Sequence, residues 1–417
     1  MDLILRNLRL RAGETTLLTD IGIAGGRIAA VEPGLATQAT QAPEAAEIEE
    51  LDLGGRFVVP GFVESHIHLD KACILERCAA EEGSLREAIA EVAKAKRAFT
   101  VEDIRARAIE TLERCILQGT TRMRSHLEVD PVIGMKGIEA VLPLIDEYRW
   151  AIDLEICVFP QEGLLDNPGT DALMVEALGR GARVVGGCPY TDSDPEGQID
   201  RVFEMAREFD VDIDFHLDFD TNPEGMTLGH VCDLTARFGW GGRVAIGHVS
   251  KLSALPAARL RVAAARLADA GVAVTVLPST DLYLMGAGRD HDVVRGVAPV
   301  HRLIEAGVNC ALSTNNLLNP FTPFGDGSLI RMANLYANIA QLGTGAGIRE
   351  CLAMVTERPA RLMRHSDYGI AVGHPADLVV LDCESAEAAV RTLATPLMGF
   401  KNGRRTFTRA PAQLHRP

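Results

Sequence analysis

The sequence predicts an α/β protein: a (β/α)₈ TIM barrel with a small β-sandwich domain formed from both ends of the chain. Three observations predict this fold. Short apolar runs alternate with helical stretches through the middle of the chain, and strand patterns stand outside that region at both ends. Several histidines stand at the carboxyl ends of the predicted barrel strands. Because 417 residues exceed what one core usually supports, we expect a second, smaller domain. We place the N-terminal part of the sandwich at residues 1–59, the barrel at 60–366 and the C-terminal part of the sandwich at 367–417.

The barrel is predicted from the alternation of strand and helix patterns. The candidate strands are Gly61–His68, Thr121–His126, Ile152–Phe159, Arg183–Cys188, Val211–His216, Arg243–His248, Val272–Leu277 and Val308–Ser313. Apolar residues recur at helical spacing in the segments 101–117, 137–148, 171–180, 197–208, 228–238, 258–270 and 294–306. Strands separated by helices form parallel sheets, and eight such strands close a barrel. A doubly wound open sheet is the alternative fold.

The chain ends are predicted to be β-structure. Leu3 to Leu10 alternate between apolar and polar residues, and the segment 21–28 is typical of a hairpin with a Gly25-Gly26 turn. The Ala-, Thr-, Gln- and Glu-rich segment 35–48 predicts a surface loop. Residues 377–382 and 399–405 again favour strands, which can pair with those of the N-terminal end.

Composition narrows the classes of function. A hydrophobic content of 47% and a charged content of 24% are ordinary for a globular protein, and the net charge of −15 argues against a broad nucleic-acid interface. The nine cysteines are odd in number and form no CxxC pair, so neither a disulfide framework nor a zinc ribbon is expected. We find no signal-peptide pattern and no apolar run long enough to span a membrane. The expectation is a cytoplasmic protein without nucleic-acid or membrane partners.

Histidines mark the predicted carboxyl ends of the barrel strands, where barrel enzymes place their active sites. His66 and His68 end the first strand, His126 the second, His216 the fifth and His248 the sixth. Residues two apart on a strand share a face, and imidazole is a preferred ligand of Zn²⁺ and Fe²⁺. A hydrogen-bonded core or rim histidine is the alternative at each position, and for His126 it is equally favoured. We therefore predict that His66, His68, His216 and His248 bind one divalent ion, Zn²⁺ or Fe²⁺.

Several segments carry a family resemblance. The segment 60–70 resembles the first-strand motif of the amidohydrolase superfamily. The segments 158–163, 214–218 and 319–325 resemble those of its branch of cytosine deaminases and N-isopropylammelide hydrolases, and the likeness spans nearly the whole chain.

The resemblance implies a mechanism and a set of roles. In the family, two strand-one histidines, one from strand five, one from strand six and an aspartate after strand eight surround the metal, which makes a bound water nucleophilic. The aspartate moves the proton of that water, a glutamate three residues after the strand-five histidine handles a ring proton, and a glutamine matching Gln161 contacts the heterocycle. A metal-dependent hydrolase of non-peptide C–N bonds is implied, acting by deamination or cyclic amide hydrolysis on a small nitrogen heterocycle or cyclic amide. A homo-oligomer is also implied.

Two of the family's proton-handling groups are replaced in this sequence. Asn315 stands where the aspartate belongs, and Phe219 stands where the deaminase glutamate belongs. An amide can accept a hydrogen bond but cannot take a proton from water. The candidate replacement bases are Asp218, Asp220, His126 and His248.

Other residues near the predicted strand ends are candidates for substrate contact. Phe219 would widen or dry the pocket, and Phe321 either stacks on a planar ring or packs in the core. Lys71 is a candidate contact for an anionic group of the substrate. The acidic residues that follow strands two and three are interpreted as solvated loop charges, namely Glu128, Asp130 and Glu162.

Three functions remain open from the sequence. We favour an active hydrolase that uses another base, because the four histidines and Gln161 are intact. The alternatives are a catalytically impaired metal-binding relative that acts as a small-molecule binding protein, and an enzyme with a non-hydrolytic reaction on a related substrate. If Asp218 or Asp220 replaces the lost glutamate, its removal should abolish turnover while the metal is kept.

Overall fold

The predicted barrel is confirmed. In the computed structural model, which describes residues 1–10, 18–35 and 48–415, one eight-stranded sheet has the order β13-β12-β11-β10-β9-β8-β7-β6, and its neighbouring strands pair in parallel. The first and last strands also meet, because the Asn315 amide donates to the His66 carbonyl and the His68 amide donates to the Asn315 carbonyl. The strands are β6 (Phe62–Ile67), β7 (Thr120–Glu128), β8 (Asp153–Phe159), β9 (Val184–Gly187), β10 (Asp212–Leu217), β11 (Val244–His248), β12 (Val272–Val276) and β13 (Cys310–Leu312).

Most of the predicted helices form. Two of them differ from the prediction at a proline, and some helices of the structure were not predicted. The predicted helix 137–148 is divided into α4 and α5 at Pro143, which has no amide hydrogen to donate. The predicted helix 294–306 begins only at Val300, directly after Pro299. Helices α2 and α10 and the helices after β13 were not predicted. The helices are α2 (Leu85–Ala95), α3 (Val101–Leu117), α4 (Lys136–Val141), α5 (Leu144–Glu147), α6 (Thr170–Arg180), α7 (Pro195–Phe209), α8 (Leu228–Phe238), α9 (Ala257–Ala270), α10 (Pro278–Leu284), α11 (Val300–Glu305), α12 (Leu329–Ile339), α13 (Gly345–Ala353), α14 (Glu357–Leu362) and α15 (Ala386–Arg391).

Two four-stranded sheets make up the second domain. One has the order β3-β2-β1-β4 and the other β16-β15-β14-β5, so strands from both chain ends contribute. A shared apolar core joins the two sheets and includes Leu5, Ile23, Val58, Leu378 and Phe400. The strands are β1 (Leu3–Leu8), β2 (Thr19–Ala24), β3 (Arg27–Glu32), β4 (Glu49–Asp52), β5 (Phe57–Pro60), β14 (Leu378–Leu381), β15 (Pro396–Lys401) and β16 (Arg404–Thr408).

The hairpin predicted at residues 21–28 forms between β2 and β3. Its turn is Gly25-Gly26, with φ of 55° and 80°, a backbone conformation that favours glycine. The predicted loop at 35–48 lies almost entirely outside the described residues. The domain boundaries at 59/60 and 366/367 remain predictions; the first of them falls inside β5.

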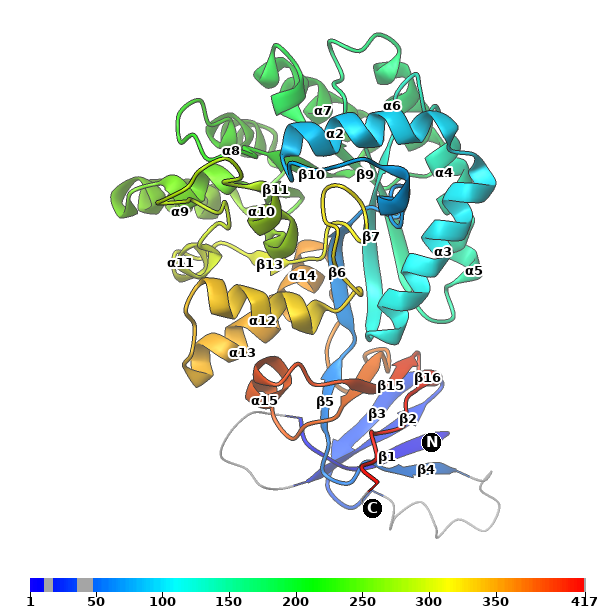
Figure 1. Ribbon diagram of the computed structural model, residues 1–417. Coiled ribbons are helices and arrows are strands. Elements are labelled where there is room, and N and C mark those ends of the chain that lie inside the picture. The colour runs from blue at the N-terminus through cyan, green and yellow to red at the C-terminus, as the bar shows by residue number, and fades with distance from the viewer. Residues whose placement is uncertain (11–17, 36–47, 416–417) are drawn as a thin grey trace.

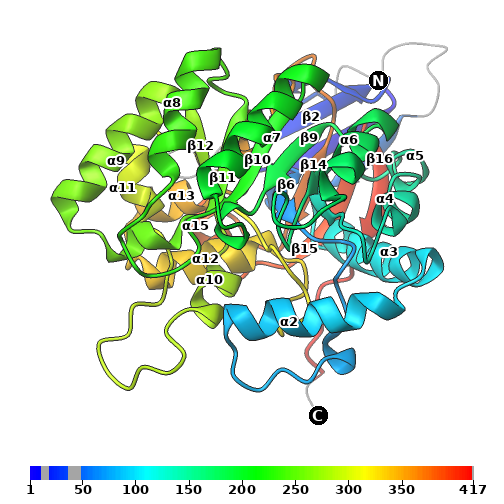
Figure 2. The same ribbon diagram turned by 90° about the horizontal axis from the view of Figure 1, so that it is seen from above.

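The β-domain lies at the amino ends of the barrel strands (Figure 1). Strand β5 of that domain leads directly into β6, which rises away from it, so the carboxyl ends of the barrel strands point to the opposite side. Viewed from above, the helices surround the sheet (Figure 2). This arrangement leaves the histidine-bearing strand ends remote from the β-domain.

Two further expectations concern the absence of a disulfide framework and of a membrane-spanning segment. All nine cysteines are free thiols, and six of them are buried. Within the described ranges, none of the helices is both long and apolar enough to cross a bilayer. The cytoplasmic location and the homo-oligomer stay predictions.

Candidate active site

Three of the four predicted ligands converge at the carboxyl end of the barrel. The Nε2 atom of His216, from β10, lies 3.1 Å from the Nε2 atom of His66 and 3.1 Å from that of His68. All three rings are almost completely buried. Their ligand atoms lie within 4.8 Å of one another, so the three residues form a group that can hold a metal ion.

The chemistry of these three rings fits a divalent ion. Burial lowers the pKa of His66 and lowers those of His68 and His216 well below the usual value, so the rings are neutral and carry free lone pairs. Three neutral imidazoles that point their Nε2 atoms at one place cannot all satisfy one another by hydrogen bonds. Their Nδ1 atoms also lack hydrogen-bond partners among the residues that the structure describes. A borderline cation such as Zn²⁺ or Fe²⁺ satisfies this donor set.

His248 lies beside this group but is held differently. It ends β11, and its ring centroid is 5.5 Å from that of His216 and 5.9 Å from that of His66. Its Nδ1 atom lies 2.6 Å from Oδ1 of Asp281, a buried residue of α10. The other oxygen of Asp281 accepts a hydrogen bond from the Leu277 amide at 3.1 Å. The role of His248 as a fourth metal ligand stays a prediction, and Asp281 was not recognised in the sequence.

A buried ion network lies behind these three histidines. His126 stacks on His66 with a centroid separation of 3.7 Å, and burial lowers the pKa of His126 to about 3. Asp214 lies 3.6 Å from His126 and 3.8 Å from His66, and it accepts a hydrogen bond from Arg124 at 2.9 Å. Burial alone would raise the pKa of Asp214, but the interactions with His126, His66 and Arg124 hold it well below its usual range. His126 is thus placed in the wall behind His66 as an uncharged ring.

Asn315 has its side-chain amide fixed by a chain of hydroxyl groups. Its Nδ2 atom donates to Oγ1 of Thr280 at 3.1 Å, and that hydroxyl lies 2.6 Å from the hydroxyl of Thr322. The Oδ1 atom is buried and has no hydrogen-bond partner in the described part of the chain. The side-chain amide therefore offers an unpaired oxygen acceptor. The main chain of Asn315 also bonds the main chains of His66 and His68.

Three candidate residues share an unusual backbone conformation. Asp218, His248 and Asn315 have φ of 49°, 67° and 63°, the left-handed region that non-glycine residues seldom adopt. Such strain, on the order of 1–3 kcal/mol per residue, concentrates at functional sites. Each residue stands at or just beyond the end of its strand, where this conformation turns the chain and redirects its side chain.

Aromatic rings form another part of the wall. Phe219, which replaces the expected glutamate, stacks on His248 with centroids 3.6 Å apart. Phe159, at the end of β8, stacks on His216 with centroids 4.7 Å apart. Phe321 is buried and lies against Lys71. The site thus combines neutral imidazoles with apolar rings, a suitable lining for a planar substrate.

Asp218 and Asp220 have other partners. Both carboxylate oxygens of Asp218 accept hydrogen bonds from the first residues of α8, one from the Thr227 amide at 3.0 Å and one from the Leu228 amide at 3.2 Å. Asp220 is half exposed and lies 3.3 Å from the ammonium group of Lys251. Their catalytic role stays a prediction, and these contacts supply a structural role for each.

We expect Asp218→Ala to cost about 1 kcal/mol of unfolding free energy, because the start of α8 loses its acceptor. Turnover should stay within a few-fold of the wild-type rate. Urea denaturation and a rate assay on the same preparation measure the two effects. A variant of unchanged stability that has lost all turnover would restore Asp218 as the base.

Comparison with known proteins decides the family. The profile of the Amidohydrolase family matches residues 49–140 and 144–407. N-isopropylammelide isopropyl amidohydrolase from Pseudomonas sp. (strain ADP) is 32% identical over 413 residues, which cover 97% of this chain and 96% of that protein. This chain belongs to the amidohydrolase family.

Two further similarities support this assignment. The structure of 5-methylcytosine deaminase from Klebsiella pneumoniae, liganded with 5-fluorocytosine, superposes with a TM-score of 0.92 at 28% identity and covers 99% of both chains. Pterin deaminase from Rhizobium rhizogenes is 29% identical over 88% of this chain and 83% of its own length. This amidohydrolase is therefore an enzyme that hydrolyses carbon–nitrogen bonds.

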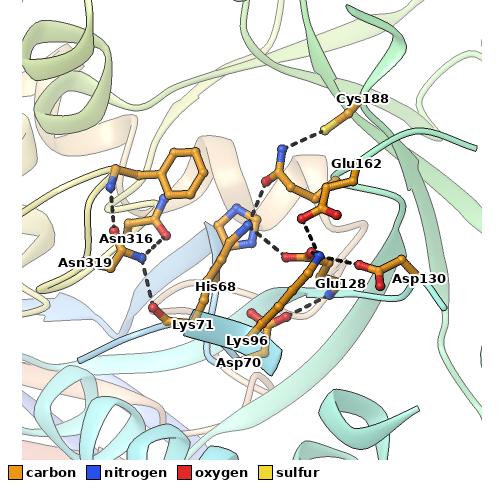
Figure 3. A network of polar contacts seen from close by, with 12 residues as sticks. His68, Asp70, Lys71, Lys96, Glu128, Asp130, Glu162, Cys188, Asn316 and Asn319 are labelled. Atoms are coloured by element: carbon orange, nitrogen blue, oxygen red, sulfur yellow. Dashed lines mark hydrogen bonds and ion pairs between the residues drawn. The ribbon is translucent and has the colours of Figure 1, made fainter. Parts of the chain in front are cut away.

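The acidic residues near the site of this amidohydrolase correct one interpretation of the sequence. Glu128 and Asp130 are buried and Glu162 is largely covered, whereas solvated loop charges were expected. All three carboxylates surround the buried ammonium group of Lys96, which directly follows α2 (Figure 3). Burial lowers the pKa of Lys96, but the carboxylates more than offset this and raise it. No local sequence pattern predicts this pairing, since Lys96 lies more than 30 residues from its partners.

Proposed function

We propose that this amidohydrolase is a metal-dependent enzyme that cleaves a non-peptide C–N bond of a nitrogen heterocycle or cyclic amide, by deamination or ring-amide hydrolysis. The proposed metal dependence rests on the convergence of the Nε2 atoms of His66, His68 and His216. The names of the relatives support the substrate class, because ammelides, pterins and cytosines are all nitrogen heterocycles.

We assign the residues as follows. His66, His68 and His216 would hold one Zn²⁺ or Fe²⁺. The Nε2 atom of His248 can serve as a fourth ligand or as a proton carrier, but not as both at once. When bound, such an ion acts as a Lewis acid and brings the acidity of water close to neutral pH. Gln161 orients the ring, Asn315 accepts a hydrogen bond through Oδ1, and Phe219 and Phe321 confine the substrate and exclude water.

The proton that the family's aspartate would carry needs another carrier here, and the geometry favours His248. Its Nδ1 atom is held by Asp281, while its Nε2 atom has no hydrogen-bond partner within the described residues. The competing candidates are otherwise engaged: Asp218 bonds the start of α8, Asp220 pairs with Lys251, and His126 lies behind His66. A ring nitrogen whose opposite nitrogen is fixed by a carboxyl group is the usual arrangement of a histidine that moves protons.

We expect Asp281→Asn to lower kcat about 10- to 100-fold, because an amide cannot share the proton that lies between Asp281 and His248. KM and metal content should change little. Steady-state kinetics together with elemental analysis separate these quantities. Unchanged kcat would remove His248 and Asp281 from proton transfer, and loss of the metal would make Asp281 a support of the metal site instead.

A substrate panel tests the proposed function. Wild-type enzyme is incubated with aminated pyrimidines, triazines, pterins and cyclic ureas, and released ammonia, amine or ring-opened product is measured. Turnover of at least one ring compound is expected, and the same preparation of His216→Ala should be inactive. Tight binding of ring compounds without product from any of them would favour the alternative, a small-molecule binding protein.

A further inference from the structure

One buried cation lies at the site and is not among the predicted catalytic groups. Lys71, three residues after His68, is only 2% exposed. Its ammonium group lies between two aromatic rings, 5.0 Å from the centroid of Phe159 and 4.9 Å from that of Phe321. Phe159 in turn stacks on His216, so the ammonium group and the metal-binding histidines border the same aromatic ring. The Lys71 charge also contributes to the lowered pKa of His68.

This cation is only partly compensated by the protein. An ammonium group has three hydrogens to donate. Of the residues described, Gln161 alone accepts a hydrogen bond from Lys71, through Oε1 at 2.7 Å. The nearest carboxylate, that of Glu128, lies at 3.6 Å and is already bonded to Lys96 (Figure 3). Lys71 therefore retains donor capacity in a buried place, where an unused charged donor is costly.

The bond to Lys71 also fixes the orientation of Gln161. Because Oε1 accepts from the ammonium group, the NH₂ end of the amide is directed to the other side, where it faces the weak acceptor Sγ of Cys188 at 3.7 Å and the hydroxyl group of Tyr190. Lys71 and Gln161 together thus present N–H donors, and the one strong acceptor of the Gln161 side chain is used internally. Such a pair matches an edge that only accepts hydrogen bonds.

We infer that Lys71 sets the substrate specificity: with Gln161 it recognises an anionic oxygen of the heterocycle, so that the substrate binds as an anion. This inference rests on the proposed function, whose substrate class it narrows. A neutral ring edge that combines a carbonyl with an N–H needs an acceptor from the protein, and Gln161 cannot supply it while Lys71 holds Oε1. An anionic ring oxygen or a carboxylate on the ring would accept from both donors and neutralise the buried charge.

The test uses three oxopyrimidine probes on the metal-loaded enzyme. Uracil is neutral at neutral pH, barbituric acid is anionic in the ring, and orotic acid carries a carboxylate. Isothermal titration calorimetry should show that wild-type enzyme binds at least one of the two anions more tightly than uracil. In Lys71→Met the affinity for that anion should fall about 10- to 100-fold, whereas the affinity for uracil should change less than about 3-fold. The preferred anion identifies which oxygen is recognised.

Two further variants separate the inferred role from a structural one. Lys71→Gln keeps a donor for Gln161 but no charge, and it should lose the preference for the anion as Lys71→Met does. Lys94→Met removes an exposed lysine of α2 that pairs with Glu91, and it should bind all three probes as wild type does. If Lys71→Met does not fold, Lys71→Gln gives the decisive comparison.

Three results would overturn the inference. These are an equal loss for uracil and the anions in the Lys71 variants, no loss for any probe, and no binding of either anion by wild-type enzyme at millimolar concentration. The proposed function stands apart from these results, because product release from the substrate panel tests it without these probes.

Discussion

Replacing His216 with alanine is expected to abolish metal binding and to lower turnover on the order of 1,000-fold or more, because the Lewis acid supplies several kcal/mol of transition-state stabilisation. His216 is the central member of the metal-binding group, since its Nε2 atom is 3.1 Å from both partner nitrogens. The ring is buried, and alanine leaves the other two histidines without their shared neighbour. Elemental analysis and the rate with the best panel substrate measure the two losses.

A surface histidine provides the matched control for this substitution. His230 lies on α8 and bonds Asp200 at 2.8 Å, and it is not among the candidate ligands. His230→Ala should keep both the metal and the rate. If His216→Ala keeps a full complement of metal, the ion is bound elsewhere and the site assigned here is wrong.

The second large effect concerns stability. Lys96→Met should lower the unfolding free energy by about 3–5 kcal/mol, because removing one partner of a buried ion group leaves the other charges uncompensated. Here Glu128, Asp130 and Glu162 would face one another without their common cation. Repulsion from Glu128 already contributes to a raised pKa of Glu162 in the intact protein, after burial as the larger cause. Urea denaturation of the variant and the wild type at the same pH measures the difference.

The pH dependence of this loss has a defined sign. Without Lys96, the folded-state pKa values of these carboxyl groups rise above their unfolded values, so the folded variant binds more protons than the unfolded chain. Its stability must then fall as the pH rises, and the deficit relative to wild type should shrink between about pH 8 and about pH 5. Lys94→Met should show no deficit at either pH. A deficit in Lys96→Met that is small and independent of pH would contradict the buried charge cluster.

The fold and the candidate metal-binding group were accessible from the sequence because both follow from short-range patterns. Alternating strand and helix periods predicted all eight barrel strands, and the rule that barrel sites lie at strand ends selected His66, His68 and His216. Two residues on one strand and one residue at the end of another need no knowledge of the loops. The sequence also showed that Asn315 and Phe219 replace the two proton-carrying residues of the family pattern.

The rest depends on contacts that loops create. Lys96 follows a helix that was not predicted, and it reaches carboxylates more than 30 residues away, so nothing local marks it or them as buried. Asp281 meets His248 only because α10 begins directly after β12 and turns back over the site. The orientation of the Gln161 amide is likewise decided by Lys71, a residue from another loop. Side-chain pairing across loops has no period, and so the sequence does not reveal it.

The metal content of protein purified without added metal tests the assignment of the histidine site. We expect about one Zn or Fe per chain, loss of turnover when a chelator removes it, and recovery when one equivalent is restored. The interpretation of the three histidines as a metal site would be wrong if the protein contained no divalent metal and hydrolysed its ring substrate at an undiminished rate in the presence of chelator.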